Sequence, residues 1–141
     1  MESVTNAPHF CYVYVNMVKT NKYPRYRIRR AILNAIGRTL LALLTDVTIE
    51  GIENIPKKGA VILAGNHVES LESAFQTFYA RRIVEPIGAG DIPFDNGLDK
   101  FVNLYGFIAV DRGTVDRAAL REAQSVLEQG AALCIFPEGG T

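Results

Sequence analysis

Apolar residues recur every three or four positions between Tyr26 and about Thr45, at Ile28, Ile32, Ile36, Leu40 and Leu43. This spacing predicts an amphipathic helix, because residues three or four apart share one helix face. Arg29, Arg30 and Arg38 lie off the apolar stripe. A basic amphipathic helix can lie in a membrane interface with its apolar face inserted. It can also pack against the rest of the domain and leave a solvated basic edge, and the periodicity leaves both possibilities open.

Beyond this helix, short apolar runs alternate with segments of helical spacing. Strands are predicted at residues 47–52, 60–65, 85–90 (ending in a turn), 107–110 and 131–136. Helices are predicted at residues 69–82, 96–106 and 114–129, the last with Thr114 as N-cap and Gly130 just past its end. The runs at 60–65, 107–110 and 131–136 are continuously apolar, which is typical of strands buried on both faces. The alternation predicts an α/β fold with a mostly parallel sheet flanked by helices and preceded by the basic amphipathic helix.

The charge distribution divides the chain into two segments. Residues 1–45 hold seven Lys and Arg and one Glu, a net charge of +6, whereas residues 46–141 carry −6. We therefore expect a basic N-terminal arm at 1–45 and a separate domain at 46–141. A basic arm indicates an anionic partner, either a membrane surface or nucleic acid. The apolar stripe and the lack of a nucleic-acid recognition motif favour the membrane.

The chain shows no secretory signal pattern, and no run approaches the roughly 20 apolar residues that a transmembrane helix needs. Cys11 and Cys134 have no metal-ligand spacing, so we expect two reduced thiols in a cytosolic environment.

Polar residues follow several of the predicted strands. Asn66 and His67 follow the strand at 60–65, Arg112 follows that at 107–110, and Glu138, Gly139 and Gly140 follow the last one. In a parallel sheet, these residues would meet at the carboxyl edge, where ligands bind.

Each of these residues suits a chemical role. His67 could act as a general base if the carboxylate of Glu72 held its Nδ1, and the planar guanidinium of Arg112 suits a phosphate. Each residue taken alone also fits a structural role. His67, Glu69, Glu72 and Asp111 could in principle ligate a cation. A His-x-Glu pair has no firm metal-site spacing, so no metal is expected.

Three sequence blocks, in this order, resemble those of the glycerolipid acyltransferase family, which includes lysophospholipid and 1-acylglycerol-3-phosphate acyltransferases. They are "NHVESLE" (66–72), "GFIAVDR" (106–112) and "FPEGG" (136–140), and the similarity covers roughly residues 46–141. The resemblance implies acyl transfer without a covalent acyl-enzyme, as part of phospholipid biosynthesis. The donor would be acyl-CoA or an acyl carrier protein, and no further cofactor would be needed. The acceptor would be a lysophospholipid or glycerol phosphate.

The resemblance also implies residue roles and a location. His67 would be the general base and Glu72 its orienting carboxylate, while Arg112 would hold the acceptor phosphate. Asn66, Glu138, Gly139 and Gly140 would belong to the acceptor site. The enzyme would rest peripherally on the cytoplasmic side of a membrane that contains anionic lipids.

The chain departs from the family pattern in three ways. Glu72 stands where the family has Asp, and Gly140-Thr141 stand where the third block usually continues to an Arg. The sequence also stops directly after a predicted buried strand, so we expect the front part of a longer protein. The two residue departures support an alternative hypothesis, a non-catalytic lipid-binding protein on the same scaffold.

Overall fold

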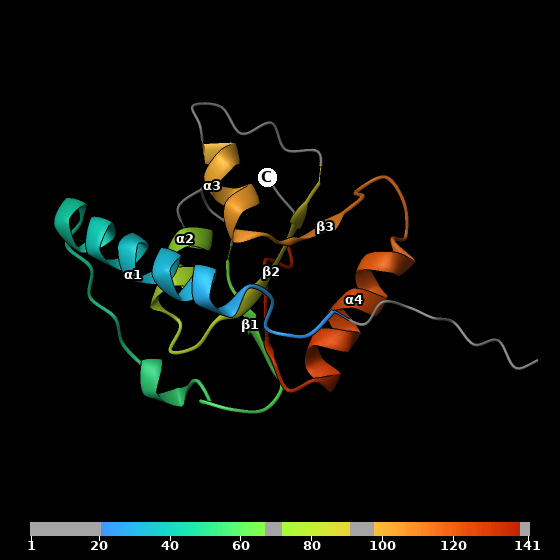
Figure 1. Ribbon diagram of the computed structural model, residues 1–141, viewed down its shortest axis with the longest axis horizontal. Coiled ribbons are helices and arrows are strands. Elements are labelled where there is room, and N and C mark those ends of the chain that lie inside the picture. The colour runs from blue at the N-terminus through green and yellow to red at the C-terminus, as the bar shows by residue number, and fades with distance from the viewer. Residues whose placement is uncertain (1–20, 67–71, 91–97, 139–141) are drawn as a thin grey trace, which may run out of the picture.

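The computed structural model describes residues 21–66, 72–90 and 98–138 (Figure 1). The elements follow in the order α1 (Arg27–Leu44), the 3₁₀ turn η1 (Ile52–Asn54), β1 (Val61–Ala64), α2 (Glu72–Tyr79), β2 (Val84–Ala89), α3 (Leu98–Tyr105), β3 (Ile108–Val110), α4 (Arg117–Glu128) and β4 (Ala132–Ile135). This alternation confirms the predicted α/β class.

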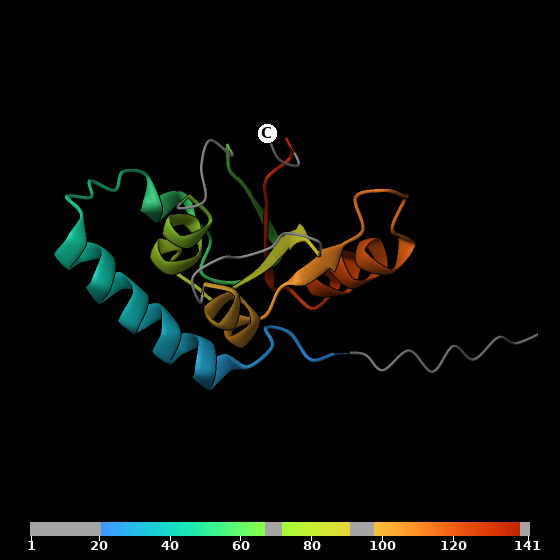
Figure 2. The same cartoon turned by 90° about the horizontal axis from the view of Figure 1, so that it is seen from above.

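The strands form one parallel sheet in the order β1-β4-β2-β3. Helices α1, α2 and α3 lie on one face of this sheet, and α4 covers the other (Figure 2). Strand β2 changes partner along its length, because Val84–Pro86 pair with β4 and Ile87–Ala89 pair with β3. Pro86, which has no N–H to donate, lies where the partner changes.

The strands differ in burial. Strand β4 is central, and Ala132, Leu133 and Cys134 are almost completely buried, as its apolar run predicted. The prediction of burial on both faces is wrong for β1 and β3, since Ile62 of β1 is 50% exposed and Ala109 of β3 is also exposed. Within the described residues β1 pairs with β4 alone. Helix α4 contacts the sheet mainly at β3 and β4 rather than at β1. Half of β1 therefore faces solvent.

Two further predictions are wrong in detail. Residues 47–52 form no strand; they are irregular, and Gly51 adopts a left-handed φ of 72° that leads into η1. Helix α4 is capped by Asp116 instead of Thr114, because the Asp116 carboxylate accepts hydrogen bonds from the backbone N–H groups of Ala118 and Ala119. The predicted end of this helix is confirmed, since Gly130 follows it with a φ of 69°.

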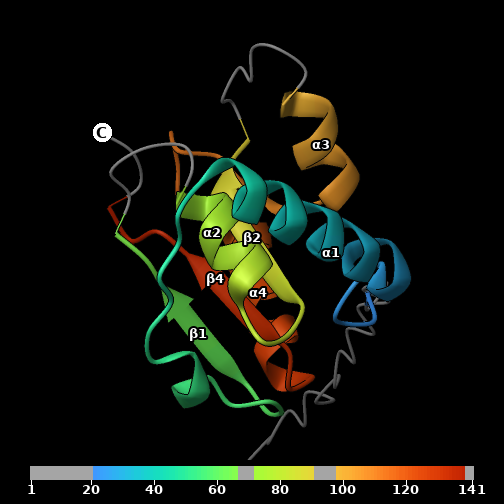
Figure 3. The same ribbon diagram turned by 90° about the vertical axis from the view of Figure 1, so that its left-hand side faces the viewer.

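Helix α1 forms where it was predicted, but its apolar stripe faces solvent. Ile28 is 80% exposed, Leu43 is 78% exposed, and the stripe residues between them are about half exposed. The opposite face is buried and carries Arg30, Leu33, Asn34 and Gly37. A Cβ at Gly37 would lie 2.6 Å from the ring of Phe78, so glycine is what allows α1 to lie closely across α2 (Figure 3). The alternative in which the stripe packs on the domain is therefore excluded for the described residues.

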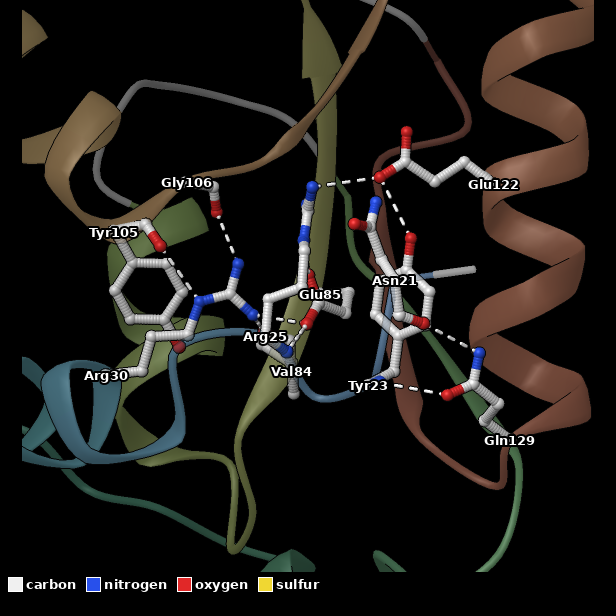
Figure 4. Close-up of polar contacts among 10 residues, drawn as sticks. All are labelled: Asn21, Tyr23, Arg25, Arg30, Val84, Glu85, Tyr105, Gly106, Glu122 and Gln129. Atoms are coloured by element: carbon white, nitrogen blue, oxygen red, sulfur yellow. Dashed lines mark hydrogen bonds and ion pairs between the residues drawn. The ribbon is translucent and has the colours of Figure 1, made fainter. Parts of the chain in front are cut away.

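Arg30 belongs to a buried network, not to the solvated basic edge that the sequence suggested. It is fully buried and forms an ion pair with Glu85 of β2, also fully buried (Figure 4). Its guanidinium donates to the backbone oxygens of Tyr105 at 2.9 Å, Gly106 at 2.8 Å and Val84 at 3.3 Å. Arg30 thus ties α1 to β2 and to the end of α3.

The segment before α1 extends this network across the sheet. Arg25 donates to Glu85 through its backbone N–H and Nε, and to Glu122 of α4 through Nη1. The hydroxyl of Tyr23 also donates to Glu122, at 2.9 Å. Arg25 and Arg30 therefore face protein carboxylates, which removes two arginines from those available to an external anion.

None of the helices in the described ranges combines the length and apolarity that crossing a membrane requires.

Candidate active site

The carboxyl ends of the parallel strands form one edge of the sheet, and the sheet order fixes their neighbours. Asn66 follows β1, Glu138 follows the adjacent β4, and Asp111 and Arg112 follow β3 at the far side of β2. The three described candidate residues, Asn66, Arg112 and Glu138, therefore lie beyond one edge, and all three are exposed. The chain segments that carry Asn66 and Glu138 are direct neighbours, whereas β2 separates both from Arg112.

Gly65 joins the exits of β1 and β4. Its N–H donates to the backbone oxygen of Ile135 at 3.0 Å, which extends the pairing beyond the strands. A Cβ at this position would lie 2.7 Å from both Gln76 Oε1 and a ring carbon of Phe136. Only glycine lets β1 leave the sheet between α2 and the β4 exit, immediately before Asn66. The sequence predictions gave Gly65 no role. The feature that could have indicated one is a glycine between an apolar run and a polar pair of residues.

Gln76 also connects α2 to the centre of the sheet. Its Oε1 accepts a hydrogen bond from the Cys134 thiol, with a donor–acceptor distance of 3.2 Å. Burial raises the pKa of this thiol to about 12. Because the thiolate is the reactive form of cysteine, Cys134 is a packing and hydrogen-bonding residue instead of a nucleophile.

The turn that carries Arg112 is held by two aspartates. Asp111 Oδ1 accepts from the N–H of Gly113 at 3.0 Å, and Asp116 Oδ2 accepts from the N–H of Asp111 at 3.2 Å. The other oxygen of Asp116 caps α4. The hydrogen bonds from Ala119 and Asp111 are the main reasons that the pKa of Asp116 lies below its usual value, so the carboxylate is ionised and accepts all three amides at neutral pH.

An apolar cleft of about 600 Å³ lies beside α2. It is lined by residues 45–52, together with Ile55, Leu63, Phe75, Gln76, Tyr79 and Ala80. Gln76, which lines this cleft, also approaches Gly65 at the exit of β1. Sequence analysis missed the cleft because the alternating apolar residues in 47–52 read as a strand, whereas here they form one of its walls.

Of the remaining candidate residues, the structure describes only the backbone of Glu72. Glu72 is the first residue of α2, which places its backbone at the start of that helix. His67, Gly139 and Gly140 lie outside the described residues. So does part of the hypothetical metal set, His67 and Glu69. Across the ranges 21–66, 72–90 and 98–138, no group of three or more His, Cys, Asp and Glu side chains could hold a metal ion.

A parallel α/β sheet with polar loops at its carboxyl edge defines the general class of protein, one that binds a ligand at that edge. Residues 46–141 match the family model described as "Acyltransferase", and the chain belongs to this family. The predicted resemblance to glycerolipid acyltransferases is thereby confirmed.

Two relatives are similar to the chain. A protein of Mycoplasma pneumoniae named "Probable 1-acyl-sn-glycerol-3-phosphate acyltransferase" is 34% identical over 128 residues, which cover 86% of this chain and 47% of the relative. A 1-acyl-sn-glycerol-3-phosphate acyltransferase of Borreliella burgdorferi is 33% identical over 98 residues, which cover 66% of this chain and 38% of the relative. The chain thus spans less than half the length of these relatives. No solved structure matches it.

Proposed function

We propose that this chain carries the acceptor side of an O-acyltransferase that esterifies the free hydroxyl of a lysophosphatidate with a fatty acyl group from acyl-CoA or an acyl carrier protein. The observation that supports this most directly is the position of Asn66, Arg112 and Glu138 beyond one edge of a parallel sheet in a chain of the acyltransferase family. The names of both relatives point to the same acceptor class.

The chemistry requires a base and an anion-binding group. His67 would take the proton from the acceptor hydroxyl, with Glu72 holding its other nitrogen, while the hydroxyl oxygen attacks the thioester carbonyl. A C–O bond forms and the C–S bond breaks. His67 then returns the proton to the departing thiolate, so donor and acceptor balance without a covalent enzyme intermediate or further cofactor.

The spacing along the sheet edge suits an acceptor that carries a hydroxyl and a phosphate on one glycerol unit. Strand β1, which precedes His67, lies three strand positions from β3, which precedes Arg112, or about 14 Å at about 4.8 Å per spacing. The imidazole of His67 and the longer side chain of Arg112, reaching inward from these ends, would meet such a small acceptor. Glu138, with Gly139 and Gly140, follows the intervening β4 and would shape the middle of the site.

The cleft beside α2 would accept the acyl chain of the donor. Its volume of about 600 Å³ lies within the common range of small-molecule sites, and apolar side chains dominate its lining. Gln76, one of its lining residues, approaches Gly65, which lies two residues before His67. An acyl chain in this cleft would bring its thioester end toward the proposed base.

The exposed stripe of α1 would rest in the interface of a membrane that contains anionic lipids. Its apolar side chains face solvent along the helix, while Arg27 and Arg38 are exposed on another side of the same helix. This combination is typical of helices that lie in a bilayer surface. The location would be the cytoplasmic side of the membrane, where thioester donors are available.

The central test is His67→Ala in the protein as its gene encodes it. We expect turnover of acyl thioester with lysophosphatidate to fall about 100- to 10,000-fold, the usual contribution of a general base. His9→Ala, which removes the chain's other histidine, is the matched control and should leave turnover unchanged. Undiminished turnover in His67→Ala would contradict the base role. Vesicle binding by the unmodified protein without thioester consumption would favour the non-catalytic, lipid-binding alternative.

A further inference from the structure

Arg112 lies in a six-residue turn, 111–116, between β3 and α4. The side chain of Arg112 is exposed, and the backbone of this turn determines where its Cα lies and in which direction the side chain leaves the chain. Two backbone amides flank it in the sequence, those of Asp111 and Gly113, and each donates to an aspartate oxygen. The turn is therefore restrained on both sides of Arg112.

Asp116 connects this turn to the body of the protein. Its Oδ1 accepts from Ala118 and Ala119 at 2.9 and 3.0 Å, while its Oδ2 accepts from Asp111 at 3.2 Å. Helix α4 is itself fixed, because Ala119 and Val126 are buried in the core cluster beneath it. The Asp116 carboxylate therefore links the packed helix α4 to Asp111, the first residue of the turn.

We infer that Asp116 is a positioning residue for Arg112, which holds the turn so that the guanidinium points to the acceptor phosphate. This inference rests on the proposed phosphate-binding role of Arg112. Asp116 would act through the backbone of Asp111 and would not touch the substrate.

Asp116→Asn separates this role from helix capping. Asparagine caps helices about as well as aspartate, so its amide oxygen can still accept from Ala118 and Ala119. Its NH₂ group would then face the N–H of Asp111, so a donor meets a donor and the link to the turn is lost. Asp116→Ala loses both the cap and the link. The midpoint of thermal unfolding should therefore fall in Asp116→Ala and stay nearly unchanged in Asp116→Asn.

The experiment is a double-mutant cycle with Arg112→Ala, in which KM for lysophosphatidate and kcat are measured in the protein as it is encoded. We expect Asp116→Asn to raise KM about threefold to tenfold, as the loss of one hydrogen bond would, with little change in kcat. In the Arg112→Ala background, Asp116→Asn should add nothing to KM.

Three outcomes would overturn the inference. An unchanged KM in Asp116→Asn, alongside a raised KM in Arg112→Ala, would refute the positioning role and leave the proposed function standing. Equal effects of Asp116→Asn in both backgrounds would show that Asp116 acts independently of Arg112. An unchanged KM in Arg112→Ala would refute the phosphate-binding role and, with it, the positioning role.

Discussion

Arg30 and Glu85 place opposite charges in the interior, between α1 and the sheet. The carboxylate of Glu85 interacts with both Arg30 and Arg25, and the guanidinium of Arg30 also satisfies three backbone oxygens. Taking these charges out of water is costly, and only this dense pairing offsets the cost. Removing one partner would leave the other charged and buried.

Glu85→Gln should therefore destabilise the protein strongly. We expect the free energy of unfolding to fall by about 3–5 kcal/mol, the usual effect of breaking a buried ion pair. Urea denaturation followed by circular dichroism measures this change. The matched control is Glu122→Gln, because the Glu122 side chain is 31% exposed and also binds Arg25; its loss should cost about 1 kcal/mol or less. Equal losses in both variants would contradict the dominant role of the buried pair.

The burial of Arg30 could not be predicted from the sequence. An arginine off an apolar stripe normally faces water, and neither of the two alternatives for this helix placed Arg30 in the interior. The partners that draw Arg30 inward, Glu85 and the carbonyls of Tyr105 and Gly106, lie more than 50 positions away in the chain. Such pairs become visible only when the strands and helices are placed in space.

Helix α1 shows the complementary case, in which the pattern predicted the helix and left its surroundings open. Periodicity located both its extent and its apolar stripe. The direction of the stripe depends on the other face, where Gly37 admits the ring of Phe78 and Arg30 finds its acceptors. The face that packs therefore carries Arg30, Leu33, Asn34 and Gly37, and the apolar stripe faces solvent.

Ile32→Gln combined with Leu40→Gln should weaken binding of the protein to vesicles that contain phosphatidylglycerol. We expect at least about a tenfold loss, or 1.4 kcal/mol, because each variant removes apolar area that would be buried in the bilayer. Flotation of the protein with vesicles measures this affinity. The control is Leu104→Gln with Leu120→Gln, two leucines of α3 and α4 that are similarly exposed, at 47% and 61%. Similar losses in both double variants would contradict a specific role of the α1 stripe.

The segment after α1 reads as a strand because apolar and polar residues alternate in 47–52. In the structure the whole segment, with its polar as well as its apolar residues, lines the cleft beside α2. The positive φ of Gly51 turns the chain into η1, and no neighbouring strand pairs with this segment in the described part of the chain. Alternation in the sequence therefore does not distinguish a strand from a segment that lines a cleft.

Ile49→Trp tests whether this cleft holds an acyl chain. Ile49 lines the cleft and is 40% exposed, so a larger side chain can enter the cleft without overpacking the core. We expect kcat/KM to fall for long-chain acyl thioesters and to change little for short-chain ones, because the added volume shortens the space available. Glu53→Trp, on an exposed position of η1 outside the cleft lining, should leave the chain-length profile unchanged. The same profile in both variants would place the acyl chain elsewhere.

At the scale of the whole molecule, the sequence predicted that the loops after the strands lie at one edge of the sheet. It did not predict the order of these loops along that edge. A parallel sheet requires that the residues after each strand lie at one edge, which is why Asn66, Arg112 and Glu138 could be grouped in advance. The insertion of β4 between β1 and β2 was not predictable from local pattern, because it depends on contacts across the complete chain. This insertion makes the exits carrying Asn66 and Glu138 neighbours, and it sets the distance from both to Arg112.

The same order leaves β1 at the edge of the sheet, and this predicts how the 141-residue chain behaves in solution. Among the described residues this edge of β1 has no strand partner, and such an edge with a half-exposed Ile62 is a template for pairing with another chain. Ile62→Lys should therefore reduce self-association, since a charge on an edge strand opposes pairing. Light scattering across a concentration series measures this effect. Leu104→Lys is the matched control, because Leu104 is 47% exposed but lies on a helix. If Leu104→Lys reduced association equally, general surface charge would be the cause; if only Leu40→Gln reduced it, association would run through the stripe of α1.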